Sequence, residues 1–163
     1  MKSQFNNLIT VVFVSFIAVF TEGSALAADT NFIPKNFSTS IGGWHGASYS
    51  VDIKDGVLNY SKSAGKKTNE FTLTPTLEQW KTFKSALNSL NVWKWKSDYI
   101  NLNILDGTSW SLDIEYSDRK LHARGANDHP TQSGKANGKP EPTEAFNTYL
   151  AAVRKLLGGK EFE

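Results

Sequence analysis

Alternating apolar and polar residues predict a β-hairpin early in the chain. Residues 47–53 place an apolar side chain at every second position, as in a half-buried strand. The Asp-Gly pair at 55–56 is typical of a tight hairpin turn, and it sets the register of the strand that follows. That register pairs apolar residues with each other: Ile53 with Leu58, and Val51 with Tyr60.

Two stretches repeat apolar residues every three or four positions, which predicts two amphipathic helices. The first begins after Thr76, which fits a capping box with Gln79, and it ends near Asn91. The second begins near Phe146 and ends at Gly158-Gly159. Each helix therefore has one face to bury against another part of the fold.

Three alternating runs, 100–104, 110–116 and 121–123, predict an antiparallel meander after the first helix. Its turns set three pairings: Ile104 with Trp110, Ile100 with Ile114, and Ile114 with Leu121. With a short strand over 70–73, the pattern predicts an α+β fold. We expect a two-layer sandwich in which an antiparallel sheet of about five to six strands carries two helices on one face.

The N-terminus has the three parts of a bacterial secretory signal peptide. Lys2 supplies positive charge, residues 8–20 are almost wholly apolar, and residues 25–27 (Ala-Leu-Ala) offer a cleavage site. The apolar run is about 13 residues long, whereas a membrane-spanning helix needs roughly 20. We therefore expect cleavage after Ala27 and a mature protein without a membrane span, in the periplasm or the medium.

The remaining sequence predicts a single domain. We expect a leader over 28–46, an α+β domain over 47–158 and a C-terminal tail over 159–163. Within the domain, residues 125–142 are rich in Gly, Asn, Lys and Pro and lack periodicity, which predicts a flexible connection or a binding loop.

Charge and cysteine content narrow the function classes. The chain has 18 Lys and Arg against 16 Asp and Glu, a net charge of +2, which gives no argument for binding nucleic acid. It has no cysteine, which excludes disulfides, thiolate metal ligands and a lipid-modified cysteine. We therefore expect a soluble, untethered product that is stabilised by packing alone.

The predicted registers bring polar residues together in rows on the exposed sheet face. These rows are Asn101, Asp113 and His122; Asn103, Ser111 and Arg124; and Glu115 with Lys120. Such rows are typical of cross-strand charge pairing, although a carboxylate beside an imidazole also fits an acid–base pair. A Ser111-His122-Asp113 triad is disfavoured, because a flat sheet lacks a pocket and free backbone donors for an oxyanion.

The three histidines lack the spacing of a metal site, although Asp128 beside His129 offers two ligand types for zinc. We expect no metal and no cofactor. Among the tryptophans, Trp80 and Trp110 follow the core periodicity, whereas Trp93 and Trp95 face opposite ways if the segment is extended. The exposed one of that pair is the best binding anchor, for which we select Trp95.

Several short motifs resemble a group of small, uncharacterised bacterial domains, many of them exported. They are the Thr-Pro-x-x-x-Gln-Trp-x-x-Phe helix start at 74–83, Asp-Gly-x-x-Trp-x-Leu-x-Ile at 106–114, and Gly-x-Asn-x-x-Pro at 125–130. The resemblance supports the architecture and implies no catalytic residue. Residues 131–140 look like an insertion relative to that group.

The leading hypothesis is a non-catalytic binding or inhibitor-like module that uses the exposed sheet face and the 125–142 loop. Its partner would be an envelope or extracellular protein, or a small ligand. The candidate binding residues are Trp95, Asn101, Asp113, His122, Arg124, Asn127 and His129. One alternative is a hydrolytic or metal-assisted enzyme centred on Asp113, His122 and His129, and another is a structural envelope protein.

Overall fold

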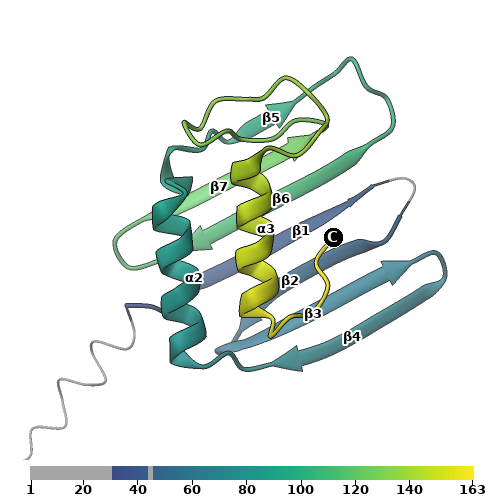
Figure 1. The fold of residues 1–163 in the computed structure, drawn as a ribbon. Coiled ribbons are helices and arrows are strands. Elements are labelled where there is room, and N and C mark those ends of the chain that lie inside the picture. The colour runs from purple at the N-terminus through teal and green to yellow at the C-terminus, as the bar shows by residue number, and fades with distance from the viewer. Residues whose placement is uncertain (1–30, 44–45) are drawn as a thin grey trace, which may run out of the picture.

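The computed structural model describes residues 31–43 and 46–163. Within them the chain forms an α+β fold, with two α-helices across one face of a mostly antiparallel sheet (Figure 1). The strands are β1 (Asn36–Gly43), β2 (Ser48–Lys54), β3 (Val57–Ala64), β4 (Lys67–Leu73), β5 (Asp98–Ile100), β6 (Thr108–Glu115) and β7 (Lys120–Ala126). The helices are α2 (Leu77–Ser89) and α3 (Glu144–Leu156), with a short 3-10 helix, η1 (Val92–Lys94). The α+β class agrees with the prediction, but the described sheet has seven strands, not five to six.

The centre of the sheet is β1, which lies in the segment predicted to be a leader. The strand order is β4-β3-β2-β1-β6-β7-β5, so β1 pairs antiparallel with both β2 and β6. The leader prediction for 28–46 is therefore wrong over 36–43. The residues that β1 turns toward the helices are Phe37, Thr39 and Ile41, and the threonine in the middle hid the apolar alternation.

The prediction that 100–104 pairs antiparallel with 110–116 is also wrong. β1 occupies that edge of β6, from Asn36 opposite Glu115 to Gly43 opposite Thr108. β5 covers only Asp98–Ile100 and runs parallel to β7. After β5, Leu102 is 85% exposed, so the alternating apolar residues of 100–104 do not form a buried strand face.

The two remaining hairpin predictions are confirmed. β2 and β3 pair Ile53 with Leu58 and Val51 with Tyr60, and β6 and β7 pair Ile114 with Leu121. At the first turn Asp55 and Gly56 both have positive φ, as a tight hairpin of this type requires. These registers follow from the local pattern because each turn joins strands that are adjacent in the chain.

Both helices begin and end close to the predicted residues. The Thr76 side chain accepts a hydrogen bond from the Gln79 backbone while the Gln79 side chain accepts one from the Thr76 backbone, which confirms the capping box. The N-cap of α3 is Thr143, and glycines with positive φ at 158 and 159 follow its end. The Gln79 amide also donates to the Leu156 carbonyl, which joins the start of α2 to the end of α3.

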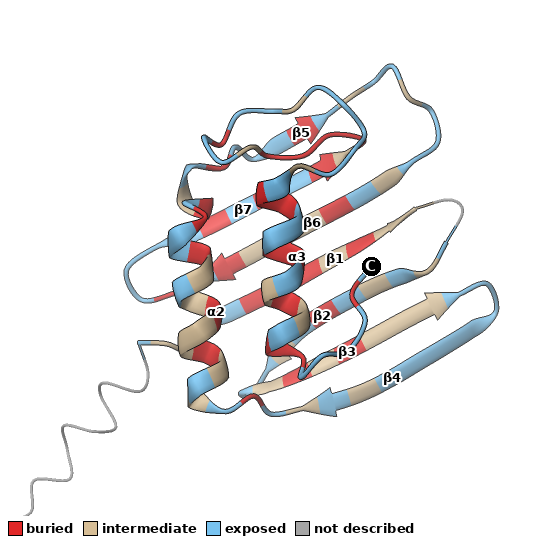
Figure 2. Ribbon diagram, viewed as in Figure 1, coloured by how far each residue is buried: buried red, intermediate tan, exposed pale blue. Residues whose placement is uncertain are grey.

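Burial alternates along the central strands and follows one stripe on each helix (Figure 2). Aromatic rings fill the space between sheet and helices: Phe37 packs edge-on against Phe83 at 5.2 Å, and Trp110 lies 4.8 Å from Phe146 between ring centroids. Trp80 and Trp110 are buried, as the periodicity predicts. None of the described helices combines the length and apolar character that crossing a membrane requires.

The segments predicted to be a loop and a tail pack against the domain. Residues 127–130 are buried, and the Asp128 carboxylate accepts three backbone N–H groups, from His129, Asn137 and Gly138. At the C-terminus Phe162 is fully buried, and the Glu161 carbonyl accepts the Tyr60 hydroxyl hydrogen. The tail prediction for 159–163 is therefore wrong, because the chain returns to the sheet after the Gly158-Gly159 turn.

One buried hydroxyl pair ties the central strand to α3. Thr39 donates to the Ser111 carbonyl at 2.8 Å, and its oxygen lies 2.5 Å from the Tyr149 hydroxyl. Because the Thr39 hydrogen is already used, Tyr149 must be the donor in the second bond. Burial also raises the pKa of Tyr149, so its hydroxyl keeps its proton at ordinary pH.

Thr39→Val should lower the free energy of unfolding by about 1–3 kcal/mol, because it leaves the buried Tyr149 hydroxyl without an acceptor. Tyr149→Phe should lower the free energy of unfolding by less, since Thr39 keeps its bond to the Ser111 carbonyl. Urea unfolding of both single variants and the double variant measures the coupling. A double variant that loses the full sum of the two single losses would contradict this arrangement.

Candidate functional site

The sheet face opposite the helices is lined by polar side chains, and we call it the free face. It is formed by alternate residues of the strands, so the pairings set its rows. Four neighbouring strands, β3, β2, β1 and β6, each carry a Ser-x-Ser sequence with both serines on this face. These serines are Ser61 and Ser63, Ser48 and Ser50, Ser38 and Ser40, and Ser109 and Ser111.

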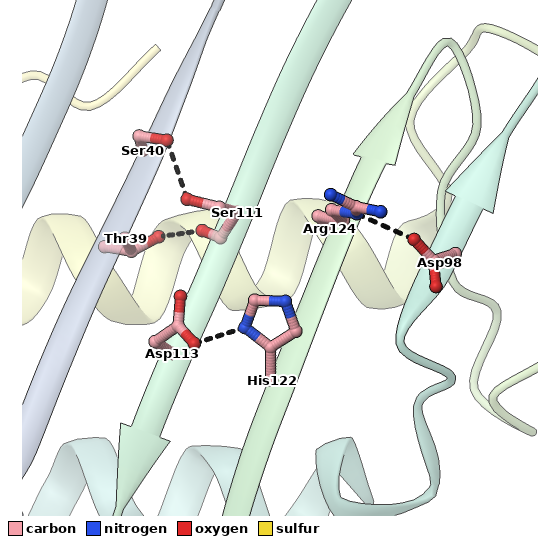
Figure 3. Close-up of polar contacts among 7 residues, drawn as sticks. All are labelled: Thr39, Ser40, Asp98, Ser111, Asp113, His122 and Arg124. Atoms are coloured by element: carbon pink, nitrogen blue, oxygen red, sulfur yellow. Dashed lines mark hydrogen bonds and ion pairs between the residues drawn. The ribbon is translucent and has the colours of Figure 1, made fainter.

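Four of these serines align across the strands in a row that we call the hydroxyl row. Its members, in order, are Ser61, Ser50, Ser40 and Ser111. The hydroxyls of Ser40 and Ser111 are hydrogen-bonded at 2.8 Å (Figure 3). The row continues to Glu70 on β4 at one end and to Arg124 on β7 at the other. It therefore presents neutral hydroxyls between an acidic end and a basic end.

Two charged pairs lie beside the hydroxyl row, both on the free face (Figure 3). The predicted neighbours Asp113 and His122 are in contact through Oδ1 and Nδ1, and Arg124 lies beside Ser111 as predicted. The Arg124 guanidinium donates to Asp98 at 2.7 Å, and this bond, with one from Ser97, holds the pKa of Asp98 below its usual value.

The two asparagines predicted for these rows lie elsewhere. Ser38 and Ser40 take the places beside Asp113 and Ser111 that were predicted for Asn101 and Asn103, because β1 fills that position in the sheet. Asn101 instead donates its side-chain amide to the Gly138 carbonyl at 3.3 Å, next to the 128–138 segment. The asparagine part of the prediction is therefore wrong, while the pairings of β6 with β7 are confirmed.

Trp95 is not an exposed anchor. Only 5% of it is exposed, and its ring packs against Tyr149 at 5.6 Å and Trp110 at 6.1 Å. The 3-10 turn of η1 removes the simple alternation that an extended segment would have, and both Trp93 and Trp95 contact the hydrophobic core. A further tryptophan of the chain, Trp44, lies outside the described residues.

Asn127 and His129 are both buried, and each has a structural role. Asn127 donates its side-chain amide to the Ile104 carbonyl and its backbone N–H to the Thr108 carbonyl, both at 3.0 Å. The first bond ties the 101–107 loop to the end of β7, and the second joins that end to the start of β6. The His129 ring lies 4.6 Å from the Phe146 ring and is 1% exposed, so it packs with α3 on the helix side.

This placement separates His129 from His122, which is on the free face with its side chain 60% exposed. Among the described residues, no three His, Asp or Glu side chains gather closely enough to hold a metal ion. The Ser111 hydroxyl bonds to Ser40 in place of an imidazole. A shallow hollow of about 440 Å³ reaches Asp113 and His122, but the residues lining it include no serine, threonine or cysteine that could act as a nucleophile.

The free face also contains a hollow that was not predicted from the sequence, which we call the serine hollow. It measures about 500 Å³ and is lined by Ser40, Ser48, Ser50, Ser61, Ser63 and Ser109, with residues 105–107 of the loop at its rim. The four Ser-x-Ser sequences are the signal that could have found it. Their alignment depends on β1, whose strand was not predicted.

No protein-family model and no curated protein sequence matches the chain. The resemblance to small exported bacterial domains therefore stays a prediction.

The buried His129 should make the fold sensitive to acid. Neither ring nitrogen has a well-formed hydrogen bond in the described structure, and burial lowers the pKa of His129 below 6.5, opposed in part by the charge of Asp128. The His129 side chain therefore binds a proton more readily in the unfolded chain than in the folded one. Because of this difference, the free energy of unfolding has its full value above about pH 6.5 and falls as the pH drops toward the lowered pKa.

Urea unfolding between pH 7.5 and 5 should show this loss, and His129→Leu should reduce it. The same substitution at the exposed His122 is the matched control and should leave the loss in place. An unchanged pH profile in His129→Leu would show that another group is responsible.

Proposed function

We propose that this chain is a non-catalytic binding module that works outside the cytoplasm and holds its ligand on the free face. The observation that carries the proposal is the hydroxyl row, in which four serines from four strands stand in register. The core does not need these side chains, because it lies on the helix side. Hydroxyl groups both donate and accept hydrogen bonds, so a regular row of them suits recognition of a polar ligand.

The charged pairs beside the row support a directional binding surface. Arg124 and His122 are each about 60% exposed as side chains, and each already has a carboxylate partner. Exposed ion pairs of this kind contribute little to stability, so both cations can exchange these partners for contacts with a ligand at little cost to the fold. Export by the predicted signal peptide would bring this surface to the periplasm or the medium.

The enzyme alternative has weaker support from the same residues. Asp113 and His122 form a close pair that could move a proton, but they lie on an open face beside solvent. The third residue of that hypothesis, His129, packs against Phe146 on the helix side. A structural envelope protein would need no such surface, and loss of binding in free-face variants separates the two.

Immobilised protein should retain one or more components of a bacterial envelope extract that the double variant His122→Ala/Arg124→Ala retains weakly. The matched control is Lys81→Ala/Lys155→Ala, which removes two charges from the helices, and it should retain the same components as the unmodified protein. Analysing the retained protein, glycan and lipid fractions separately makes the result independent of ligand class. Equal retention by the double variant and the control would overturn the proposal.

A further inference from the structure

Resting on the proposed function, we infer that the ligand of the free face is a neutral saccharide chain. It lies across the strands along the hydroxyl row and enters the serine hollow. The hydroxyl groups of the hollow, the charge of its described lining and an apolar side chain at its rim all suit such a ligand.

A glycine interrupts a second row of serines beside the hydroxyl row. The row contains Ser63, Ser48 and Ser109, and Gly42 of β1 stands between the last two, opposite Ser109. A Cβ on Gly42 would lie 2.3 Å from the Ser48 hydroxyl, so the glycine allows Ser48 to lie against the β1 backbone. Gly42 therefore contributes backbone, and no side chain, to a hollow lined by hydroxyl groups.

The lining of the hollow is nearly uncharged. The described residues that line it include no lysine, arginine or histidine, and Asp106 at the rim carries the only carboxylate among them. Within the hollow, the described residues would therefore offer an anionic ligand one repulsive carboxylate and no counter-charge. Neutral hydroxyl groups fit better, because they can donate to Asp106 and can both donate to and accept from the serines.

The rim supplies the apolar contact that a sugar ring needs on its C–H face. Leu105 is 96% exposed and lines the hollow, and the neighbouring residue of its loop, Ile104, is bonded through its carbonyl to the Asn127 side chain. A leucine on a loop anchored in this way meets a ligand at a reduced cost in conformational entropy.

The spacing of the row also suits a chain of sugars. Neighbouring strands are about 4.8 Å apart, so successive hydroxyls of the row repeat at that distance. This distance is close to the length of one sugar ring in an extended saccharide. A chain that crosses β3, β2, β1 and β6 can therefore place one ring over each strand.

Calorimetric titration with three neutral hexasaccharides, cellohexaose, maltohexaose and chitohexaose, tests the inference, and hexagalacturonate is the anionic comparison. At least one neutral hexasaccharide should bind at millimolar concentration or below. Ser50→Val should weaken that binding about tenfold because it removes a hydroxyl from the row. Threonine has nearly the same shape as valine but keeps the hydroxyl, so Ser50→Thr should bind within about threefold of the unmodified protein. Ser85→Val on the exposed side of α2 is the matched control.

Three results would overturn the inference: no neutral hexasaccharide binds, hexagalacturonate binds more tightly than all three, or Ser50→Val and Ser50→Thr bind equally well. Thermal unfolding of each variant shows whether a loss of binding is a loss of fold. If the hexasaccharides fail while His122→Ala/Arg124→Ala still loses an envelope component, the free face binds another ligand class and only the saccharide inference fails. If that double variant loses nothing, the proposed function fails as well.

Discussion

The double pairing of β1 is the constraint on which the rest of the structure depends. β1 is hydrogen-bonded to β2 on one side and to β6 on the other, so it joins the β2-β3-β4 meander to the β6-β7-β5 part of the sheet. Its alternate side chains serve both faces: Thr39 bonds to α3 through Tyr149, while Ser40 bonds to Ser111 on the free face. A slip of one residue would exchange these faces and place serines in the core.

The parts of the fold that the sequence predicts are those whose signals are local. The Asp55-Gly56 turn fixes one hairpin because it joins neighbouring strands, and the Thr76-Gln79 capping box fixes a helix start within four residues. β1 and β5 depend instead on partners that are farther along the chain, β6 for β1 and β7 for β5. The turn expected between 104 and 110 indicated the wrong partner for the 100–104 run, in which Leu102 has the spacing of a strand residue but is exposed to solvent.

In the candidate site too, only the contacts within one hairpin could be predicted from the sequence. Asp113 opposite His122 could be predicted because both belong to one hairpin, and the contact of the two side chains follows from that register. The hydroxyl row could not, since its four serines align only after β1 is inserted between β2 and β6. Trp95 and His129 were misjudged because nothing local in the sequence shows that α3 covers both.

Amide hydrogen exchange tests most directly whether β1 is the central strand of this sheet. Because β1 is paired on both sides, the amides of Thr39 and Ile41 should exchange as slowly as those of β6, through global unfolding. Amides on the open side of the edge strand β4 should exchange much faster. If β1 exchanged as fast as that edge, the segment would be a peripheral leader, and neither the hydroxyl row nor the serine hollow would exist as described.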